Sequence, residues 1–230
     1  MILKGLQKMT LLDYPGKVAA TVFTGGCNMR CPFCHNAPLV LFSNEVETVC
    51  TEDFFTFLKK RQGILDGVCV TGGEPLLQAD LADFLGEIKS LGFSVKLDTN
   101  GTNPQKLREL IDARLVDYVA MDIKNSPSRY AETVGIDGFD LSPVFDSVSL
   151  LLSGIVDYEF RTTVVRELHS EEDLLAIAAW IKNAQHYYLQ GYIDSGHLIS
   201  DGLSGYSAQD LGKLLLSVQK ILPVTELRGI

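Results

Sequence analysis

Three cysteines in the first part of the chain are spaced for metal chemistry. Cys27, Cys31 and Cys34 follow one another in C-x3-C-x2-C spacing, after the apolar run 18–24 and two glycines. Thiolates are soft ligands that favour zinc, copper(I) and iron–sulfur clusters. A four-iron cluster held by only these three side chains would keep one iron free of protein ligands. That iron could bind a substrate, and this open position is our first functional hypothesis.

Two other interpretations of these cysteines stay open. Free cysteine behaves as a small apolar residue, so the three thiols could be ordinary core residues. A zinc ion could instead take the thiolates with His35 as its fourth ligand. However, His35 directly follows Cys34, whereas zinc motifs usually separate neighbouring ligands by two or more residues. Cys50 and Cys69 stand apart from each other, so the sequence predicts a single cluster and no even disulfide framework.

The elements that must position these residues alternate between strands and helices. Strands are predicted over 18–24, 67–71, 94–97, 118–121, 158–165 and 187–193, and helices over 51–65, 81–91, 104–113, 140–153, 170–183 and 207–222. Residues 2–17 are predicted as an extended lead-in segment. Alternation of this kind favours an α/β fold with a parallel sheet of right-handed βαβ units, in a single domain over 1–230. About six strands are too few for a complete eight-stranded barrel, and the periodicity allows either a partial, open barrel or a doubly wound sheet.

Polar segments follow the ends of four predicted strands. They are the cysteine loop, Gly72–Glu74, Asp98–Gly101 and Asp122–Lys124. Parallel barrels place their active sites in the loops after the strands, so this pattern favours the barrel and predicts that the four segments converge. Taken alone, Gly72–Glu74 and Asp98–Gly101 are also typical of simple turns. Arg161 lies within a predicted strand, where it could face a carboxylate inside the barrel or extend to the surface.

Several of these motifs together resemble one family. The cysteine spacing, the aromatic Phe33 before the last cysteine and the segment Gly72–Pro75 resemble the radical S-adenosylmethionine superfamily. Cys34–Asn36 resembles the activating enzymes of glycyl-radical proteins. Leu11–Lys17 and Glu226–Gly229 are similar to segments of the small activating proteins of anaerobic ribonucleotide reductases. The resemblance extends over essentially the whole chain.

The resemblance implies a partial parallel β/α barrel with one [4Fe-4S] cluster and S-adenosylmethionine bound at its open iron. One electron from the reduced cluster would cleave the cofactor to methionine and a 5′-deoxyadenosyl radical. Gly72, Gly73 and Glu74 would receive the methionyl amino group, since glycines let a backbone approach a ligand closely. The cluster ligands, which are the catalytic residues of this chemistry, would be Cys27, Cys31 and Cys34.

Five further residues acquire expected roles from the same resemblance. Lys124, helped by Asp122, would take the methionyl carboxylate. Phe33 and His35 flank the last cysteine and could touch the adenine. Asp98 and Asp122 could also contribute to a monovalent cation beside the cofactor. The sequence assigns no role to three other residues, His197, Cys50 and Cys69.

Composition restricts the class of protein. A chain of 230 residues with 46% hydrophobic and 21% charged residues fits one large globular domain. The formal net charge of −9 argues against general nucleic-acid binding, which needs clustered Lys and Arg. No apolar run approaches the ~20 residues of a membrane-spanning helix, and the first residues lack the apolar segment of a secretory signal. We therefore expect a cytoplasmic protein in a reducing environment.

Three functions are compatible with the sequence. The first is an activase that abstracts hydrogen from a glycine of a partner glycyl-radical enzyme. By resemblance this partner would be an anaerobic ribonucleotide reductase, with a flavodoxin- or ferredoxin-like protein as electron donor. The second is the same radical chemistry on a small molecule of modified-nucleoside synthesis. The third is an iron–sulfur or zinc protein that only binds or transfers electrons.

Overall fold

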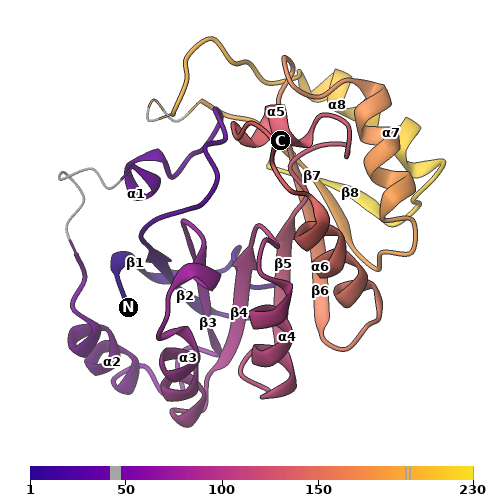
Figure 1. Cartoon of the computed structure of the whole chain (residues 1–230). Coiled ribbons are helices and arrows are strands. Elements are labelled where there is room, and N and C mark those ends of the chain that lie inside the picture. The colour runs from indigo at the N-terminus through magenta and orange to yellow at the C-terminus, as the bar shows by residue number, and fades with distance from the viewer. Residues whose placement is uncertain (42–47, 195, 197, 230) are drawn as a thin grey trace.

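One curved sheet organises the molecule, a computed structural model in which residues 1–41, 48–194, 196 and 198–229 are described (Figure 1). Within these residues the sheet has eight strands that lie in the order of the sequence. They are β1 (Leu3–Thr10), β2 (Ala19–Thr24), β3 (Gly67–Gly72), β4 (Ser94–Thr99), β5 (Tyr118–Asp122), β6 (Asp157–Val164), β7 (Tyr187–Gly191) and β8 (Thr225–Arg228).

From β2 onward, helices lie between successive strands and cover the outer face of the sheet (Figure 1). α4 packs against α6, and α7 packs against α8. None of the described helices is long and apolar enough to cross a bilayer. The helices are α1 (Ala37–Val40), α2 (Thr51–Lys59), α3 (Leu81–Ser90), α4 (Pro104–Asp112), α5 (Tyr130–Val134), α6 (Ser142–Leu152), α7 (Glu171–Trp180) and α8 (Ala208–Gln219), with a 3-10 turn η1 at Pro75–Leu77.

The strand order confirms the prediction of an open, parallel α/β barrel. β2 to β8 pair in parallel with their sequence neighbours, and β1 pairs antiparallel with β2. In a doubly wound sheet the order would reverse at a switch point, and here it does not. Among the described residues β1 and β8 do not pair with each other, so the barrel stays open between them.

The predicted number of about six strands was too low, because both edge strands were missed. β1 lies in the segment predicted as a lead-in, and β8 lies where no strand was predicted. β1 has half-buried and exposed residues between its two buried ends, so its sequence lacks a clean alternation. β8 has only four residues, which is too short for a periodic signal. The short helices α1 and α5 were missed for the same reason.

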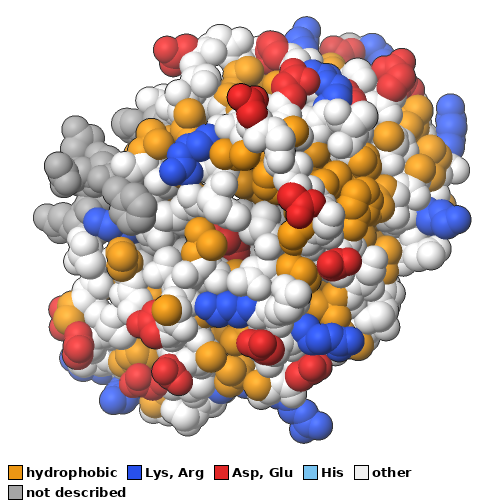
Figure 2. Space-filling view, in the orientation of Figure 1, with side chains coloured by type: hydrophobic (Ala, Val, Ile, Leu, Met, Phe, Trp, Pro, Cys, Tyr) orange, Lys and Arg blue, Asp and Glu red, His pale blue; other side chains and the backbone are white. Residues whose placement is uncertain are grey.

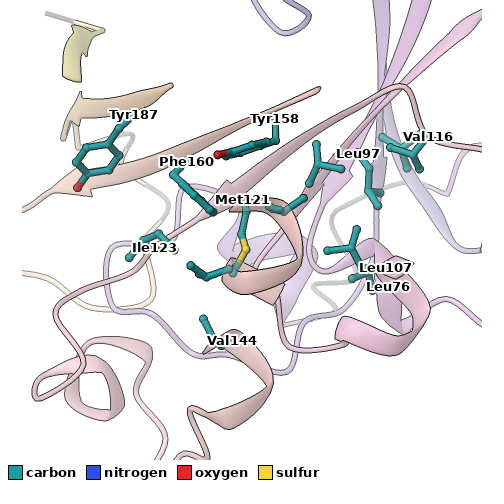
Figure 3. Packing of buried hydrophobic residues seen from close by; sticks show 14 of the residues in the cluster. Leu76, Leu97, Leu107, Val116, Met121, Ile123, Val144, Tyr158, Phe160 and Tyr187 are labelled. Atoms are coloured by element: carbon teal, nitrogen blue, oxygen red, sulfur yellow. The ribbon is translucent and has the colours of Figure 1, made fainter. Parts of the chain in front are cut away.

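Alternation along the strands separates an apolar outer face from a polar interior. Val68 and Val70 flank Cys69 on β3, and on β4 the buried Val95 and Leu97 alternate with Lys96 and Asp98. Successive side chains of a strand point to opposite faces, so the apolar set meets the helices and the polar set lines the barrel. Figure 3 shows the outer layer, where residues of the sheet pack against residues of the helices: Leu97, Met121, Phe160, Leu107 and Val144. Each such side chain contributes about 1.5–3 kcal/mol by burial.

Basic side chains on the surface are scattered. On the face shown in Figure 2, Lys and Arg alternate with acidic and apolar side chains. The three-residue basic run at 59–61 lies at the end of α2, as a solvated helix end would. The cationic groups that matter for chemistry lie instead inside the barrel.

Candidate functional site

A cavity of about 220 Å³ lies where β2 to β7 end. It is bordered by the cysteine loop after β2 and by residues at the ends of the next strands. The residues predicted from the sequence that line it are Cys27, Cys31, Phe33, Cys34, His35, Gly72, Gly73, Asp98, Asp122, Lys124 and Arg161. The lining also includes residues that were not predicted, among them Asn36, Asn100, Thr163 and Gln190. The expected convergence of the four polar segments is therefore seen.

The cysteine loop is held by backbone hydrogen bonds to segments distant in sequence. Arg30 N donates to the carbonyl of Val134 at 2.8 Å, and Ser200 N donates to the carbonyl of Pro32 at 3.1 Å. α5 is followed by its C-cap residue Gly135, which has a left-handed φ of 67°. A Cβ at Gly135 would lie 2.5 Å from Arg30 O, so only glycine lets the loop dock so closely. Figure 1 shows α5 beside this loop.

Burial controls the protonation of the three thiols. It raises the pKa of Cys27 and Cys34, and it raises the pKa of Cys31 to about 12. The positive charge of Lys124 acts in the opposite direction on all three, so the ammonium faces the loop. Thiolates are the form that binds metal, and a group bound here would displace three protons.

The donor set fits a cluster better than a single ion. Three cysteines bound to different irons of a cluster need not converge on one point. In the described part of the chain no three His, Cys, Asp or Glu side chains gather around one ion position. The ring of His35 packs against Tyr192, with ring centres 5.8 Å apart. The zinc site with His35 as a fourth ligand is therefore not preassembled among these residues.

The two glycines after β3 bring that strand against the cysteine loop. Gly73 N donates to Thr24 O at 2.9 Å, and Glu74 N donates to Gly26 O at 2.8 Å. A Cβ on Gly73 would lie 1.9 Å from Gly26 O, and Gly72 has a φ of 114° with a similar clash against Thr24. Side chains at these positions would push the two segments apart. The glycines therefore allow the close contact between the two segments that border the cavity.

Glu74 lies behind this wall, not among the residues that line the cavity. Its carboxylate is fully buried and accepts hydrogen bonds from Leu76 N (3.0 Å), Thr99 Oγ1 (2.8 Å) and Asn100 N (2.7 Å). Burial nevertheless raises its pKa to about 7. The side chain thus links the turn after β3 to the segment after β4. This places Asn100 at the cavity, where its Nδ2 donates to Asn28 Oδ1 at 2.9 Å.

Five charged side chains form a continuous row across β4, β5 and β6. Lys96 is ion-paired with Asp98 Oδ1, and Arg161 Nη1 donates to Asp98 Oδ2 at 3.1 Å. Arg161 Nε donates to Asp122 Oδ1 at 2.9 Å, and Lys124 Nζ donates to Asp122 Oδ2 at 2.9 Å. Arg161 therefore faces carboxylates inside the barrel, which was one of its two predicted orientations.

The row carries a net positive charge, because three cations meet two carboxylates. Burial alone would raise the pKa of Asp122, but Arg161 and Lys124 outweigh it and the pKa is lowered. Burial would likewise lower the pKa of Lys124, but the Asp122 carboxylate outweighs it and the pKa is raised. The pKa of Asp98 is lowered and that of Arg161 is raised, in both cases against the effect of burial and by the same charge pairing. Lys124 uses one of its three N–H donors on Asp122, so it can also bind an anionic group in the cavity.

His169 is hydrogen-bonded to the backbone of Lys124 and was not predicted as a site residue. A carbonyl can only accept, so the ring donates from Nε2 to Lys124 O at 2.7 Å, while Val165 N donates to Nδ1 at 3.1 Å. The ring also meets Phe33 edge-on, with centres 6.2 Å apart. No sequence signal pointed to this histidine, because its partners are backbone groups. Lys96 did carry a signal, since a lysine in an otherwise buried strand needs a partner.

The remaining cysteines and the last histidine lie apart from the cavity lining or outside the described residues. Cys50 is exposed and its Sγ donates to Glu52 Oε2 at 2.7 Å. Cys69 is fully buried on β3, with its Sγ 3.7 Å from Asp98 Oδ1. His197 falls outside the described residues.

Comparisons with known proteins agree with this geometry. The family model of the radical SAM superfamily matches residues 21–183. A protein of Methanocaldococcus jannaschii, provisionally named a glycyl-radical enzyme activating enzyme, is 35% identical over 83% of this chain and 80% of its own length. The pyruvate formate-lyase-activating enzyme of Clostridium pasteurianum is 29% identical over 79% and 76%. The 7-carboxy-7-deazaguanine synthase of Koribacter versatilis is 26% identical over 95% and 94%.

Solved structures extend the likeness to the fold. SuiB of Streptococcus suis, solved with bound S-adenosylmethionine, superposes with a TM-score of 0.70 at 15% identity, over 90% of this chain. The matched part spans 49% of the length of SuiB. The match of the family model over most of the sheet, on a chain whose three cysteines border the cavity, leads to one conclusion: this protein belongs to the radical SAM superfamily.

Proposed function

We propose that this radical SAM enzyme is an activase that abstracts a hydrogen atom from a glycine of a partner glycyl-radical protein. The observation that carries the proposal is that the cysteine loop, the glycine turn and Lys124 border one cavity. The names of two relatives, which refer to glycyl-radical activation and to pyruvate formate-lyase activation, support the substrate class. The open side of the barrel between β1 and β8 is compatible with a protein loop as substrate.

Each part of the cavity wall has a proposed role. A [4Fe-4S] cluster on Cys27, Cys31 and Cys34 would supply the electron and the open iron for cleavage of S-adenosylmethionine. Lys124, oriented by Asp122 and by the hydrogen bond from His169 to its carbonyl, would bind the methionyl carboxylate. The backbone of the glycine turn would bind the amino group, with Glu74 bracing that turn from behind the wall.

The rest of the cavity wall suits the nucleoside part of the cofactor. Phe33 and His35 border the cavity directly beside Cys34 and would contact the adenine. Asn36 Nδ2 donates to Gly72 O at 2.9 Å and so ties this segment to the glycine turn. Closing these segments around the cofactor would exclude water from the radical.

The row of ion pairs argues against the monovalent cation expected beside Asp98 and Asp122. Each of the four carboxylate oxygens already accepts from Lys96, Arg161 or Lys124. A bound cation would have to share these oxygens with the three cationic groups and would be repelled by them. We therefore propose that the ammonium of Lys96 provides the positive charge at this place.

The partner and the electron donor are proposed from the sequence. Leu11–Lys17 and Glu226–Gly229 resemble activating proteins of anaerobic ribonucleotide reductases, which makes such a reductase the first partner to test. A flavodoxin- or ferredoxin-like protein in a reducing cytoplasm would supply the electron.

The proposal is tested by anaerobic reconstitution with iron and sulfide, reduction, and addition of S-adenosylmethionine with a glycyl-radical reductase. We expect 5′-deoxyadenosine and the doublet of a glycyl radical in the EPR spectrum. Cys34→Ala should lose both products, and Cys50→Ala, at an exposed thiol far from the loop in sequence, should retain both. Product with an intact cluster but without any radical on a competent partner would reject the activase assignment.

The alternative function is radical chemistry on a small molecule. It is favoured by the relative from Koribacter versatilis, which is named a 7-carboxy-7-deazaguanine synthase and matches nearly the whole chain. The two functions differ in what must be added for turnover. Multiple turnovers with a carboxylated pterin and no protein partner would support the alternative.

A further inference from the structure

We propose that Arg228, on the last strand, is a positioning residue for the cofactor cavity. By neutralising the buried Glu159 it leaves Arg161 available to hold Asp98 and Asp122. The inference concerns binding of S-adenosylmethionine to this radical SAM enzyme, and it holds whichever substrate the radical attacks.

Glu159 is a fully buried carboxylate deep inside the barrel. It lies on β6, two residues before Arg161, so the two side chains share the inner face of the strand. Arg228 donates to both of its oxygens, from Nη1 to Oε1 at 2.8 Å and from Nη2 to Oε2 at 3.1 Å. The hydroxyl of Tyr118 donates to Oε2 at 3.0 Å. The two-pronged contact with Arg228 is the strong one, because both partners are charged and planar.

Arg228 is fixed in this position by the sheet itself. It pairs in register with Gln190 on β7, and its guanidinium lies 3.6 Å from the centre of the Tyr188 ring. Stacking of this kind suits a guanidinium better than an ammonium. The side chain is 32% exposed, so it reaches Glu159 from the open edge of the barrel. The same carboxylate raises the pKa of Arg228, although burial acts against this.

Arg161 is the other cation close to Glu159. Its Nη1 lies 4.0 Å from Glu159 Oε1, and the same nitrogen donates to Asp98 Oδ2 at 3.1 Å. Arg161 thus stands between a carboxylate that Arg228 satisfies and two carboxylates at the cavity. A buried carboxylate that loses its partner costs several kcal/mol, unless another cation moves to it or it takes up a proton.

Removal of Arg228 should therefore change the ion pairs at the cavity. Arg161 would turn toward Glu159 and release Asp98 and Asp122, and Asp122 is the residue that orients Lys124. The change would start at the far edge of the sheet and end at the group proposed to bind the methionyl carboxylate. The segments Leu11–Lys17 and Glu226–Gly229, which have no role at the cavity in the proposed function, both approach Tyr118. The ring of Tyr14 lies 6.0 Å from the ring of Tyr118, and the hydroxyl of Tyr118 donates to the carboxylate that Arg228 binds.

The test compares charge variants by their affinity for S-adenosylmethionine, measured by calorimetry on the reconstituted, folded protein. Arg228→Gln should weaken binding about tenfold or more, a loss of about 1.4 kcal/mol. Glu159→Gln should bind within about threefold of the wild type, because Arg228 is partly solvated and tolerates the loss of its partner. The decisive variant is Glu159→Gln with Arg228→Gln, which should also bind within about threefold of the wild type, since nothing then competes for Arg161.

The control variant removes a hydrogen bond to Glu159 and leaves the charges unchanged. Tyr118→Phe removes a hydrogen bond to the same carboxylate but no charge, and it should leave the affinity nearly unchanged. If Arg228→Gln does not fold, the double variant still tests the proposal, because recovery of folding and of near-wild-type affinity on adding Glu159→Gln would identify the unpaired carboxylate as the cause. Weak binding by the double variant would show that Arg228 acts by some route other than Glu159. Wild-type affinity in folded Arg228→Gln would equally overturn the proposal.

Discussion

Lys96 is the most deeply buried cation of the charged row, with 2% of its side chain exposed. Its ammonium pairs with Asp98, whose other oxygen accepts from Arg161. A lysine in this environment is retained only if its charge is used, because taking it out of water is costly. The use proposed above is to provide a tethered cation where a free ion would otherwise be bound.

Lys96→Met tests this at the scale of one residue. We expect the free energy of unfolding to fall by about 3 kcal/mol, since one partner of a buried pair is removed. Potassium or ammonium ions should restore part of the loss, whereas choline at equal ionic strength should not. Urea unfolding in the three chloride salts measures both effects.

Lys213→Met is the matched control, because Lys213 forms an exposed pair with Asp210 on α8. It should cost about 0.5 kcal/mol and show no preference among the salts. Equal responses of the two variants to all three salts would contradict the proposed role of Lys96.

His169 gives the stability a dependence on acidic pH. Its two ring nitrogens are engaged in the neutral form, and burial lowers its pKa below the ordinary value of about 6.5. As the pH falls below about 6.5, the unfolded chain takes up a proton that the folded ring refuses. The contribution of His169 is therefore complete above that pH and decreases as the pH falls.

His169→Gln keeps an amide donor that can reach Lys124 O but removes the titration. Denaturant unfolding at several values between pH 5 and 7.5 should show the wild type losing stability relative to this variant on acidification. His186→Gln, at an exposed ring, should follow the wild type. Parallel curves for His169→Gln and the wild type would rule out this account.

At the scale of elements, the ends of β2 and β3 depend on contact between two backbones. Gly73 approaches Gly26 so closely that there is no space for a methyl group at Gly73. The glycine turn after β3 forms one side of the cavity. The geometry of the site is thus set by strand pairing, which extends in register from Ala19 with Gly67 to Thr24 with Gly72.

Gly73→Ala should lower the free energy of unfolding by about 2 kcal/mol or more, and it should weaken cofactor binding because the turn must move. Gly212→Ala, in open space on α8, should instead stabilise by about 0.5–1 kcal/mol and leave binding unchanged. Thermal unfolding and a binding titration of both variants measure this. An unchanged melting temperature for Gly73→Ala would mean that the segments separate at no cost.

At the scale of the whole molecule, the interior of the sheet was predictable from sequence and its edges were not. β3, β4 and β5 are apolar runs between helices with clear amphipathic faces, so their place was fixed by periodicity. The polar segments after them could be assigned to the cavity, because parallel strands end on one side. Pairing partners across the barrel, such as Glu159 with Arg228, could not be predicted, because they depend on closure of the sheet and not on local pattern.

Some residues of the site could be predicted from sequence and others could not. Cys27, Cys31, Cys34 and Lys124 were identified because their spacing or position after a strand marks them. Glu74 was predicted to face a ligand, but its carboxylate is taken by backbone and hydroxyl donors that sequence does not show. Contacts to backbone groups carry no signature in residue types, and they decide where such side chains point.

The order of the strands has a consequence for how the protein is made. Each strand pairs with the one synthesised before it, so the sheet can grow along the nascent chain without waiting for distant segments. Glu159 on β6 is an exception to this order, because its partner Arg228 is synthesised 69 residues later. Until β8 leaves the ribosome, Glu159 on β6 has no arginine partner, and burying its carboxylate would cost several kcal/mol. We therefore expect the interior of the barrel to stay hydrated up to that point. Pairing of β8 with β7 thus allows water to leave the barrel and the cofactor cavity to take its final form.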